Sequence, residues 1–198
     1  MNTLPPIVKN LIIINVLVFI AQLVLGPFGL TGILALRPIG LGFQPYQLAT
    51  HMFAHGDFLH ILFNMYSLWM FGQMLENMWG PKRFLLFYLI CGVGAAALHL
   101  LVLYLTGDYA IAVGASGAIM GVFAAFAYLF PNFQLMLFPF PFPVKAKWMV
   151  LGLVLLDLFG GIAPSGGSNV AHFAHLGGAI TGFIIVLFFN KTDRRNFY

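Results

Sequence analysis

Charged side chains are scarce in this sequence. Asp, Glu, Lys and Arg together make up 7% of its 198 residues, whereas hydrophobic residues make up 61%. Typical globular chains carry roughly 25% charged residues. A soluble domain of this length could not cover its surface with so few charges, so the composition indicates a single membrane domain over residues 1–198.

Cysteine is nearly absent as well. The single cysteine, Cys91, lies within an apolar run. One cysteine excludes an intramolecular disulfide and a cysteine-based metal cluster, so we expect it to serve in packing. The formal net charge of +4 is scattered between hydrophobic runs, which favours a membrane-topology signal over a nucleic-acid surface.

Long apolar runs, by contrast, fill most of the chain. A helix needs about 20 apolar residues to cross a hydrocarbon core of about 30 Å, and the runs lack the alternation of a transmembrane β-barrel. The first run is read as a membrane helix and not as a signal peptide, because further spans follow. We therefore predict an all-α, polytopic membrane protein with six transmembrane helices, at about residues 11–25, 58–78, 83–105, 116–130, 146–160 and 170–189.

Two of the connections have a distinctive composition. Residues 26–57 are rich in Pro, Gly and aromatic residues, which predicts short helical pieces lying partly in the membrane interface. Residues 133–145 contain three prolines and cannot form a regular helix.

The basic residues predict the orientation of the six helices. Of the nine Lys and Arg residues, only Arg37 lies on one side of the predicted topology. Cytoplasmic connections carry an excess of Lys and Arg, so the pattern predicts that both termini are cytoplasmic. The other eight fall at the alternate set of connections: Lys9, Lys82, Arg83, Lys145, Lys147, Lys191, Arg194 and Arg195.

Polar residues stand near the start of the second, fourth and sixth predicted helices, which all run in the same direction. These residues are His60, Ser116 and His175. Asn64 follows His60 by four positions and therefore shares its helix face. Ionisable residues within a membrane are costly and mark function by default, so we expect the three helices to build one site at similar depth.

Paired glycines follow two of these polar residues. Gly117 and Gly121 follow Ser116, and Gly178 and Gly182 follow His175. Small residues four positions apart let membrane helices approach closely, which would bring the serine hydroxyl within reach of the imidazole. The run from residue 116 to residue 130 is about 22 Å long as a helix, short for a full span, so water could reach Ser116 from above.

These residue types suit hydrolysis by a serine nucleophile. The Ser116 hydroxyl needs an adjacent base, and His175 can take its proton and later give it to a leaving amine. The Ser116 backbone N–H, at a helix N-terminus, and the side chains of His60 and Asn64 can stabilise an oxyanion. Asp157 lies elsewhere in the spans, as does Glu76, so we predict a Ser–His dyad without an acidic third member.

The order of the motifs resembles the rhomboid family of intramembrane serine proteases, in its six-helix bacterial form. The resemblance covers nearly the whole chain and rests on His55, His60-x-x-x-Asn64, Glu76, Gly114-x-Ser116-Gly117 and Ala174-His175-x-x-Gly178-x-x-x-Gly182.

The resemblance implies a role for each of these sites. It implies Ser116 as nucleophile, His175 as base, and His60 and Asn64 as oxyanion donors. The implied reaction is cleavage of transmembrane substrates near helix-breaking residues, with a small residue before the cut. The fifth helix and the stretch 160–168 would correspond to the family's gate and cap. Met120 departs from the family pattern, because an aromatic residue often stands there and packs on the histidine ring.

The remaining polar residues have simpler readings. His172, three residues before His175, competes with it as base, but the glycine spacing favours His175, and His172 is expected to hold water or a backbone carbonyl. Four further residues are expected to be structural or hydrogen-bonded locally, with the acid satisfied by a helix end or a loop: His51, His55, His99 and Glu76. Asp157 is expected to be satisfied in the same way.

Two other functions compete with proteolysis. A metal-handling membrane protein could use histidines 51, 55, 172 and 175, but the sequence has no His-Glu-x-x-His motif and this reading leaves Ser116 and Asn64 without a role. A catalytically inactive rhomboid-like protein could instead bind transmembrane segments.

The expected partners and location follow from the protease reading. We expect transmembrane protein substrates and the lipid bilayer as partners, with no nucleic acid, metal or cofactor. We also expect a multi-pass protein of the cell (inner) membrane whose active site faces the extracytoplasmic side.

Overall fold

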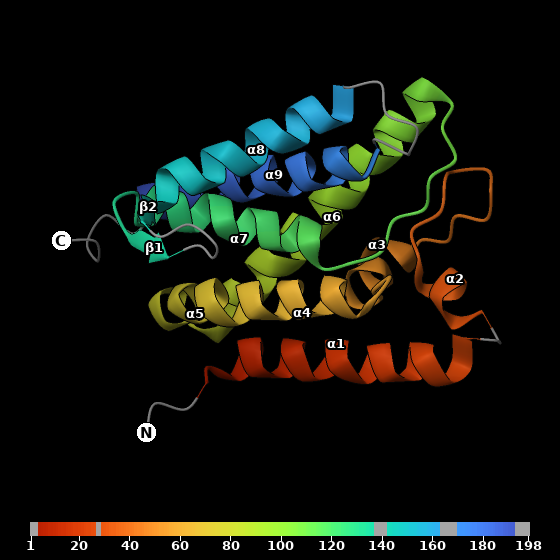
Figure 1. Ribbon diagram of the computed structural model, residues 1–198, viewed down its shortest axis with the longest axis horizontal. Coiled ribbons are helices and arrows are strands. Elements are labelled where there is room, and N and C mark those ends of the chain that lie inside the picture. The colour runs from red at the N-terminus through yellow and green to blue at the C-terminus, as the bar shows by residue number, and fades with distance from the viewer. Residues whose placement is uncertain (1–3, 27–28, 137–141, 163–169, 193–198) are drawn as a thin grey trace.

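The computed structural model describes residues 4–26, 29–136, 142–162 and 170–192. It is predominantly helical and contains one small hairpin (Figure 1). The helices, in chain order, are α1 (Pro6–Leu25), α2 (Leu30–Leu34), α3 (Gln47–Thr50), the 3-10 turn η2 (His51–Phe53), α4 (Phe58–Ser67), the π-helical turn η3 (Leu68–Gly72), α5 (Gln73–Trp79), α6 (Pro81–Thr106), α7 (Ser116–Leu129), α8 (Ala146–Ile162) and α9 (Val170–Thr192).

Three helices in the described part of the chain are long and apolar enough to cross a membrane. They are Pro6–Leu25, Pro81–Thr106 and the segment Ala171–Asn190 of α9. The second predicted helix is a continuous helical path, but the π turn η3 divides it into α4 and α5, and α7 has only 14 residues. The helical membrane character is therefore supported, whereas six spans and cytoplasmic termini stay predictions.

Helix α1 begins five residues before the predicted start. Pro6 occupies its first position, where the missing N–H of proline costs nothing. The Glu76 carboxylate accepts hydrogen bonds from the backbone N–H groups of Ile7 (2.9 Å) and Val8 (2.7 Å). The first N–H groups of a helix have no partner within it, so this buried acid of α5 caps α1. Glu76 is thus satisfied by a helix end, as the sequence predicted.

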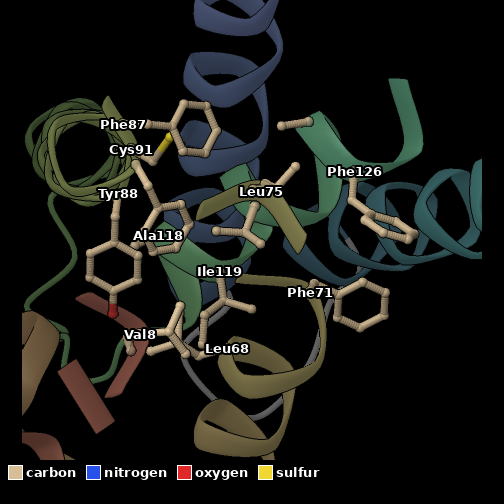
Figure 2. Packing of buried hydrophobic residues seen from close by; sticks show 14 of the residues in the cluster. Val8, Leu68, Phe71, Leu75, Phe87, Tyr88, Cys91, Ala118, Ile119 and Phe126 are labelled. Atoms are coloured by element: carbon tan, nitrogen blue, oxygen red, sulfur yellow. The ribbon is translucent and has the colours of Figure 1, made fainter. Parts of the chain in front are cut away.

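Buried side chains from α1, α4, η3, α5, α6 and α7 form most of the main hydrophobic core. Figure 2 shows Val8 and Leu68 close together near Ile119, with Phe87 farther away in the same cluster, beside Cys91. Cys91 is also buried in this cluster, which agrees with a packing role. This core fixes α7, the helix that begins with Ser116, against α4–α5 and α6.

The segment before α8 differs from the all-α prediction. Strands β1 (Gln134–Met136) and β2 (Pro143–Lys145) pair as an antiparallel hairpin, with Leu135 opposite Val144. Proline cannot donate to a ladder and is tolerated at such an edge. The prolines at 139 and 141 lie outside the described residues.

The helices alternate in direction, so that α4, α7 and α9 all begin at the same end of the bundle (Figure 1). Helices α1, α6 and α8 begin at the opposite end, which therefore carries Lys9, Lys82, Arg83 and Lys147. This arrangement places the polar residues at the starts of α4, α7 and α9 on one side of the molecule.

Candidate active site

Ser116 is the first residue of α7 and follows a tightly held loop. Gly114 adopts φ +120°, a conformation that side chains of other residues rarely allow, and its N–H donates to the His51 carbonyl (2.8 Å). Two hydrogen bonds between Leu36 and Ala112 tie the same loop to the first connection. The helix therefore begins at a fixed point, with the half-buried Ser116 at its N-terminus.

His175 reaches this serine from α9. Its Nε2 lies 2.8 Å from Ser116 Oγ, within hydrogen-bond distance. About 30% of the His175 side chain is exposed, which leaves room for a substrate or water beside it. The two residues are 59 positions apart in sequence, so only the packing of α7 against α9 brings them together.

The paired glycines carry that packing. A Cβ added to Gly178 would collide with the Gly117 carbonyl, and one added to Gly182 would lie 2.5 Å from the Gly121 Cα. The backbones of α7 and α9 are therefore in direct contact along both glycine pairs. A side chain at either glycine of α9 would push the histidine away from the serine.

His60 and Asn64 converge on the backbone just before Ser116. A Cβ added to Gly114 would lie 2.6 Å from His60 Nε2 and 3.7 Å from Asn64 Nδ2. Asp57 caps α4 by accepting from the His60 N–H (2.8 Å), which fixes the start of the helix that bears both side chains.

Both side chains present a donor at this point. The N–H of Gly56 makes a long hydrogen bond of 3.4 Å to His60 Nδ1, so the ring proton resides on Nε2, the nitrogen that faces Gly114. Asn64 Nδ2 is buried and has no hydrogen-bond partner among the described residues. Buried polar groups normally have partners, so this amide is a donor available to a ligand.

A cavity of about 330 Å³ lies at this place. His51, His60, Ser116 and His175 contribute polar atoms, and the rest of the wall is formed mainly by small or branched apolar side chains and glycine. The cavity therefore lies beside Ser116 and His175 and is mostly apolar in its lining.

Asp157 corrects the prediction that no acidic residue is placed to orient His175. Its Oδ1 lies 3.0 Å from His175 Nδ1 and 2.8 Å from His172 Nδ1. The sequence reading missed this contact because Asp157 lies on a different helix, α8. The available signal was a carboxylate in the middle of an apolar helix, which is costly unless paired.

The other polar residues have defined surroundings. His172 bonds Asp157 instead of the water or carbonyl expected from the sequence. His55 packs edge-on against His60, with ring centroids 5.1 Å apart, and burial lowers its pKa to about 4. Its backbone is held by Gln22, and His51 Nδ1 donates to the Gln47 carbonyl (2.8 Å).

Met120, the departure from the family pattern, is buried in a small cluster with Ala124 and Ala179. It therefore fills the contact between α7 and α9 one turn below Ser116. The stretch expected to form a cap, residues 160–168, lies mostly outside the described residues, which resume at residue 170.

The sequence of this chain is similar to those of known proteins. A family model described as "Rhomboid domain" matches residues 42–192. The chain is 33% identical over 144 residues to "Rhomboid protein 1, mitochondrial" of Saccharomyces cerevisiae, covering 70% of this chain and 40% of that protein. It is 34% identical over 154 residues to the human "Presenilin-associated rhomboid-like protein, mitochondrial", covering 77% of this chain and 40% of that protein.

A plant relative is similar to this chain at a comparable level of identity. "RHOMBOID-like protein 6, mitochondrial" of Arabidopsis thaliana is 32% identical over 166 residues, covering 81% of this chain and 50% of that protein. The matched region thus spans half or less of the length of these relatives.

The names of these relatives overturn one expectation and confirm another. All three are named mitochondrial, so the location predicted from the sequence, a cell (inner) membrane with an extracytoplasmic site, is wrong. That prediction rested on the positive-inside rule, which gives sidedness relative to a membrane and cannot identify the membrane. The family prediction is confirmed: the chain belongs to the rhomboid family.

Proposed function

We propose that this protein is an intramembrane serine endopeptidase that cleaves transmembrane segments of membrane proteins, with Ser116 as nucleophile and His175 as general base and acid. The observation that carries the proposal is the 2.8 Å distance between Ser116 Oγ and His175 Nε2, beside two donors that converge on Gly114. A serine hydroxyl is weakly nucleophilic until a neighbouring base accepts its proton.

The first half of the reaction forms an acyl-enzyme. Ser116 Oγ attacks the scissile carbonyl carbon while His175 Nε2 accepts the hydroxyl proton. The carbonyl oxygen becomes an oxyanion, which accepts hydrogen bonds from Asn64 Nδ2, His60 Nε2 and the Ser116 N–H at the start of α7. When the intermediate collapses, the C–N bond breaks and the imidazolium gives its proton to the leaving amine.

The second half consumes water. His175 Nε2 takes a proton from a water molecule, whose oxygen attacks the ester carbonyl. The same three donors stabilise the second oxyanion, and the Ser116 oxygen leaves with the proton held by His175. The partial exposure of His175 and the cavity beside it are consistent with access for that water.

The unpartnered Asn64 amide favours this function over a purely structural one. Burying a polar donor without a partner costs roughly 1–3 kcal/mol. A site for a developing oxyanion gives this donor a role that helix packing alone does not supply.

Rhomboid membership and the names of the relatives support the substrate and the location. The substrates are proposed to be transmembrane proteins with a small residue before the cleaved bond, and the membrane is proposed to be a mitochondrial one.

The decisive experiment compares wild type with Ser116→Ala in lipid bilayers on a generic transmembrane substrate. We expect cleavage by the wild type alone, and covalent labelling by a serine-directed phosphonate in the wild type alone. Chelators should leave both results unchanged.

Each alternative gives a different result. Binding of the substrate without cleavage or labelling would identify an inactive binding protein. Cleavage that survives Ser116→Ala but stops with a chelator would identify a metal-dependent function, although the described residues contain no group of three or more His, Cys, Asp or Glu side chains arranged to hold a metal.

A further inference from the structure

Asp157 is the one acidic residue of α8 and is buried, with 8% of its surface exposed. Most of the helix around it is apolar. A single carboxylate oxygen, Oδ1, lies within hydrogen-bond distance of two ring nitrogens of α9, His172 Nδ1 at 2.8 Å and His175 Nδ1 at 3.0 Å.

The close approach of α8 to α9 fixes this contact. A Cβ added to Gly160 would lie 2.8 Å from the His172 ring, and one added to Gly161 would lie 2.9 Å from the Phe173 ring. Three residues after Asp157, the backbone of α8 therefore lies against side chains of the helix that carries both histidines.

The contact with Asp157 decides which ring nitrogen of His175 carries the proton. A neutral imidazole carries one N–H, on either Nδ1 or Nε2, and the partner of one nitrogen decides the state of the other. An ionised carboxylate can only accept, so Nδ1 must hold the proton to bond Asp157. Nε2 is then left with a lone pair, and it is Nε2 that lies 2.8 Å from Ser116 Oγ.

The same contact acts later in the reaction. When His175 takes the Ser116 proton it becomes a cation, and the Asp157 carboxylate is 3.0 Å away in a partly buried setting. Opposite charges at this distance attract more strongly there than in water. The acid therefore favours both the starting tautomer and the charged intermediate.

We propose that Asp157 is a positioning residue for catalysis, which holds the proton of His175 on Nδ1 and extends the Ser116–His175 pair to a Ser–His–Asp array. The proposal rests on the proposed protease function. His172 is the second donor to the same oxygen and anchors the carboxylate, while its own ring, with 41% of the side chain exposed, is turned more toward the surface.

Three variants test the proposal, with kinetics measured in bilayers on a transmembrane substrate. Asp157→Asn keeps the volume and removes the charge, whereas Asp157→Glu keeps the charge and changes the length. His172→Ala removes the second donor and leaves the bond to His175. The melting temperature of each variant shows whether it is folded.

We expect Asp157→Asn to lower kcat at least tenfold, up to roughly the 10⁴-fold loss that follows a wrong histidine tautomer in Ser–His–Asp hydrolases, with KM changed less than about twofold. Asp157→Glu should retain more activity than Asp157→Asn, because it keeps a negatively charged hydrogen-bond acceptor. A role in packing alone predicts the reverse order, since asparagine fits the site better. A kcat within twofold of wild type for Asp157→Asn, or the reverse order, overturns the proposal.

A spectroscopic measurement on the wild type needs no variant at the aspartate. Nitrogen NMR of histidine-labelled protein, with His175→Ala to assign the signal, should show the proton of His175 on Nδ1. A proton on Nε2 overturns the proposal even if Asp157→Asn fails to fold. If the wild type neither cleaves nor is labelled at Ser116, the protease function fails, and the NMR result still decides whether Asp157 sets the tautomer.

Discussion

Gly178 of α9 lies directly against the backbone of Gly117 in α7. Gly117 follows Ser116, and Gly178 follows His175 by three positions. The tightest contact between the two helices therefore lies beside Ser116 and His175, the pair that we propose carries out the reaction. Helix packing and the geometry of the site depend on the same two residues.

Gly178→Ala should therefore lower both stability and activity. The added methyl group must displace the backbone of α7, and overpacking of this kind costs typically 1–3 kcal/mol. We expect a lower melting temperature in detergent and a lower turnover number per folded molecule, because the shift separates His175 from Ser116.

Gly152→Ala is the matched control for this change. A Cβ at Gly152, in α8, meets nothing within 4 Å, and alanine favours a helix over glycine by about 1 kcal/mol. The control should keep or raise the melting temperature and leave turnover unchanged. Equal effects of the two substitutions would show that the contact between α7 and α9 is not tight.

Asn64→Ala should lower turnover far more than stability. Removal of one oxyanion donor typically costs about 10²–10³ in rate. The Asn64 Nδ2 has no partner to lose among the described residues, so the melting temperature should stay the same or rise. Asn77→Ala, an exposed change on α5, serves as control. An unchanged turnover number for Asn64→Ala would refute the oxyanion role.

Substitution of the two histidines that share Asp157 should affect activity to very different extents. His175→Ala removes the only ring that reaches Ser116 among the described residues, so cleavage and phosphonate labelling should both fall to background. His172→Ala should leave a measurable part of the activity, because the Asp157–His175 bond remains. The opposite ranking, measured as initial cleavage rates at equal protein, would reassign the base to His172.

The buried His51 should make the stability of the protein depend on pH. It lies in η2, outside the long membrane helices, and burial lowers its pKa to about 4, with a hydrogen bond to Gln47 opposing the shift and nearby His99 adding to it. A histidine whose folded pKa is below its unfolded value of 6.5 contributes its full stability above pH 6.5. That contribution, roughly 3 kcal/mol, is lost as the pH falls from 6.5 to 4.

His51→Asn tests this dependence, since asparagine can donate to the Gln47 carbonyl without titrating. Melting temperatures measured between pH 4 and 7 should fall less steeply with acid for the variant than for the wild type. Parallel curves would show that His51 is not the group responsible.

The contrast between Glu76 and Asp157 shows what sequence reasoning can reach. Both are single acids in apolar helices, and the sequence predicts that each is satisfied by a helix end or a loop. Glu76 does cap a helix, although the helix is α1, about 70 positions away. Asp157 instead binds two histidines of α9, because the rotation of α8 about its axis and its approach at Gly160 turn that face toward them. No residue spacing within one helix encodes that relation.

The boundaries of the helices show a similar limit. The apolar run predicts a first helix from about residue 11, yet α1 begins at Pro6 because a carboxylate from another helix caps it. The π turn at Leu68–Gly72 interrupts a run that reads as one uniform span. The start of α1 arises from a contact with another element, and neither feature has a pattern in the local sequence.

The sequence by itself determined the membrane class, the order of the helical segments and the residues Ser116, His60, Asn64 and His175 as candidates, because hydrophobicity and spacing within one helix are local properties. Only the tertiary structure decided that Ser116 and His175 lie 2.8 Å apart and that Asp157 stands behind the histidine. Those distances depend on how closely α7, α8 and α9 approach and which faces they turn toward one another, and packing between distant segments sets both.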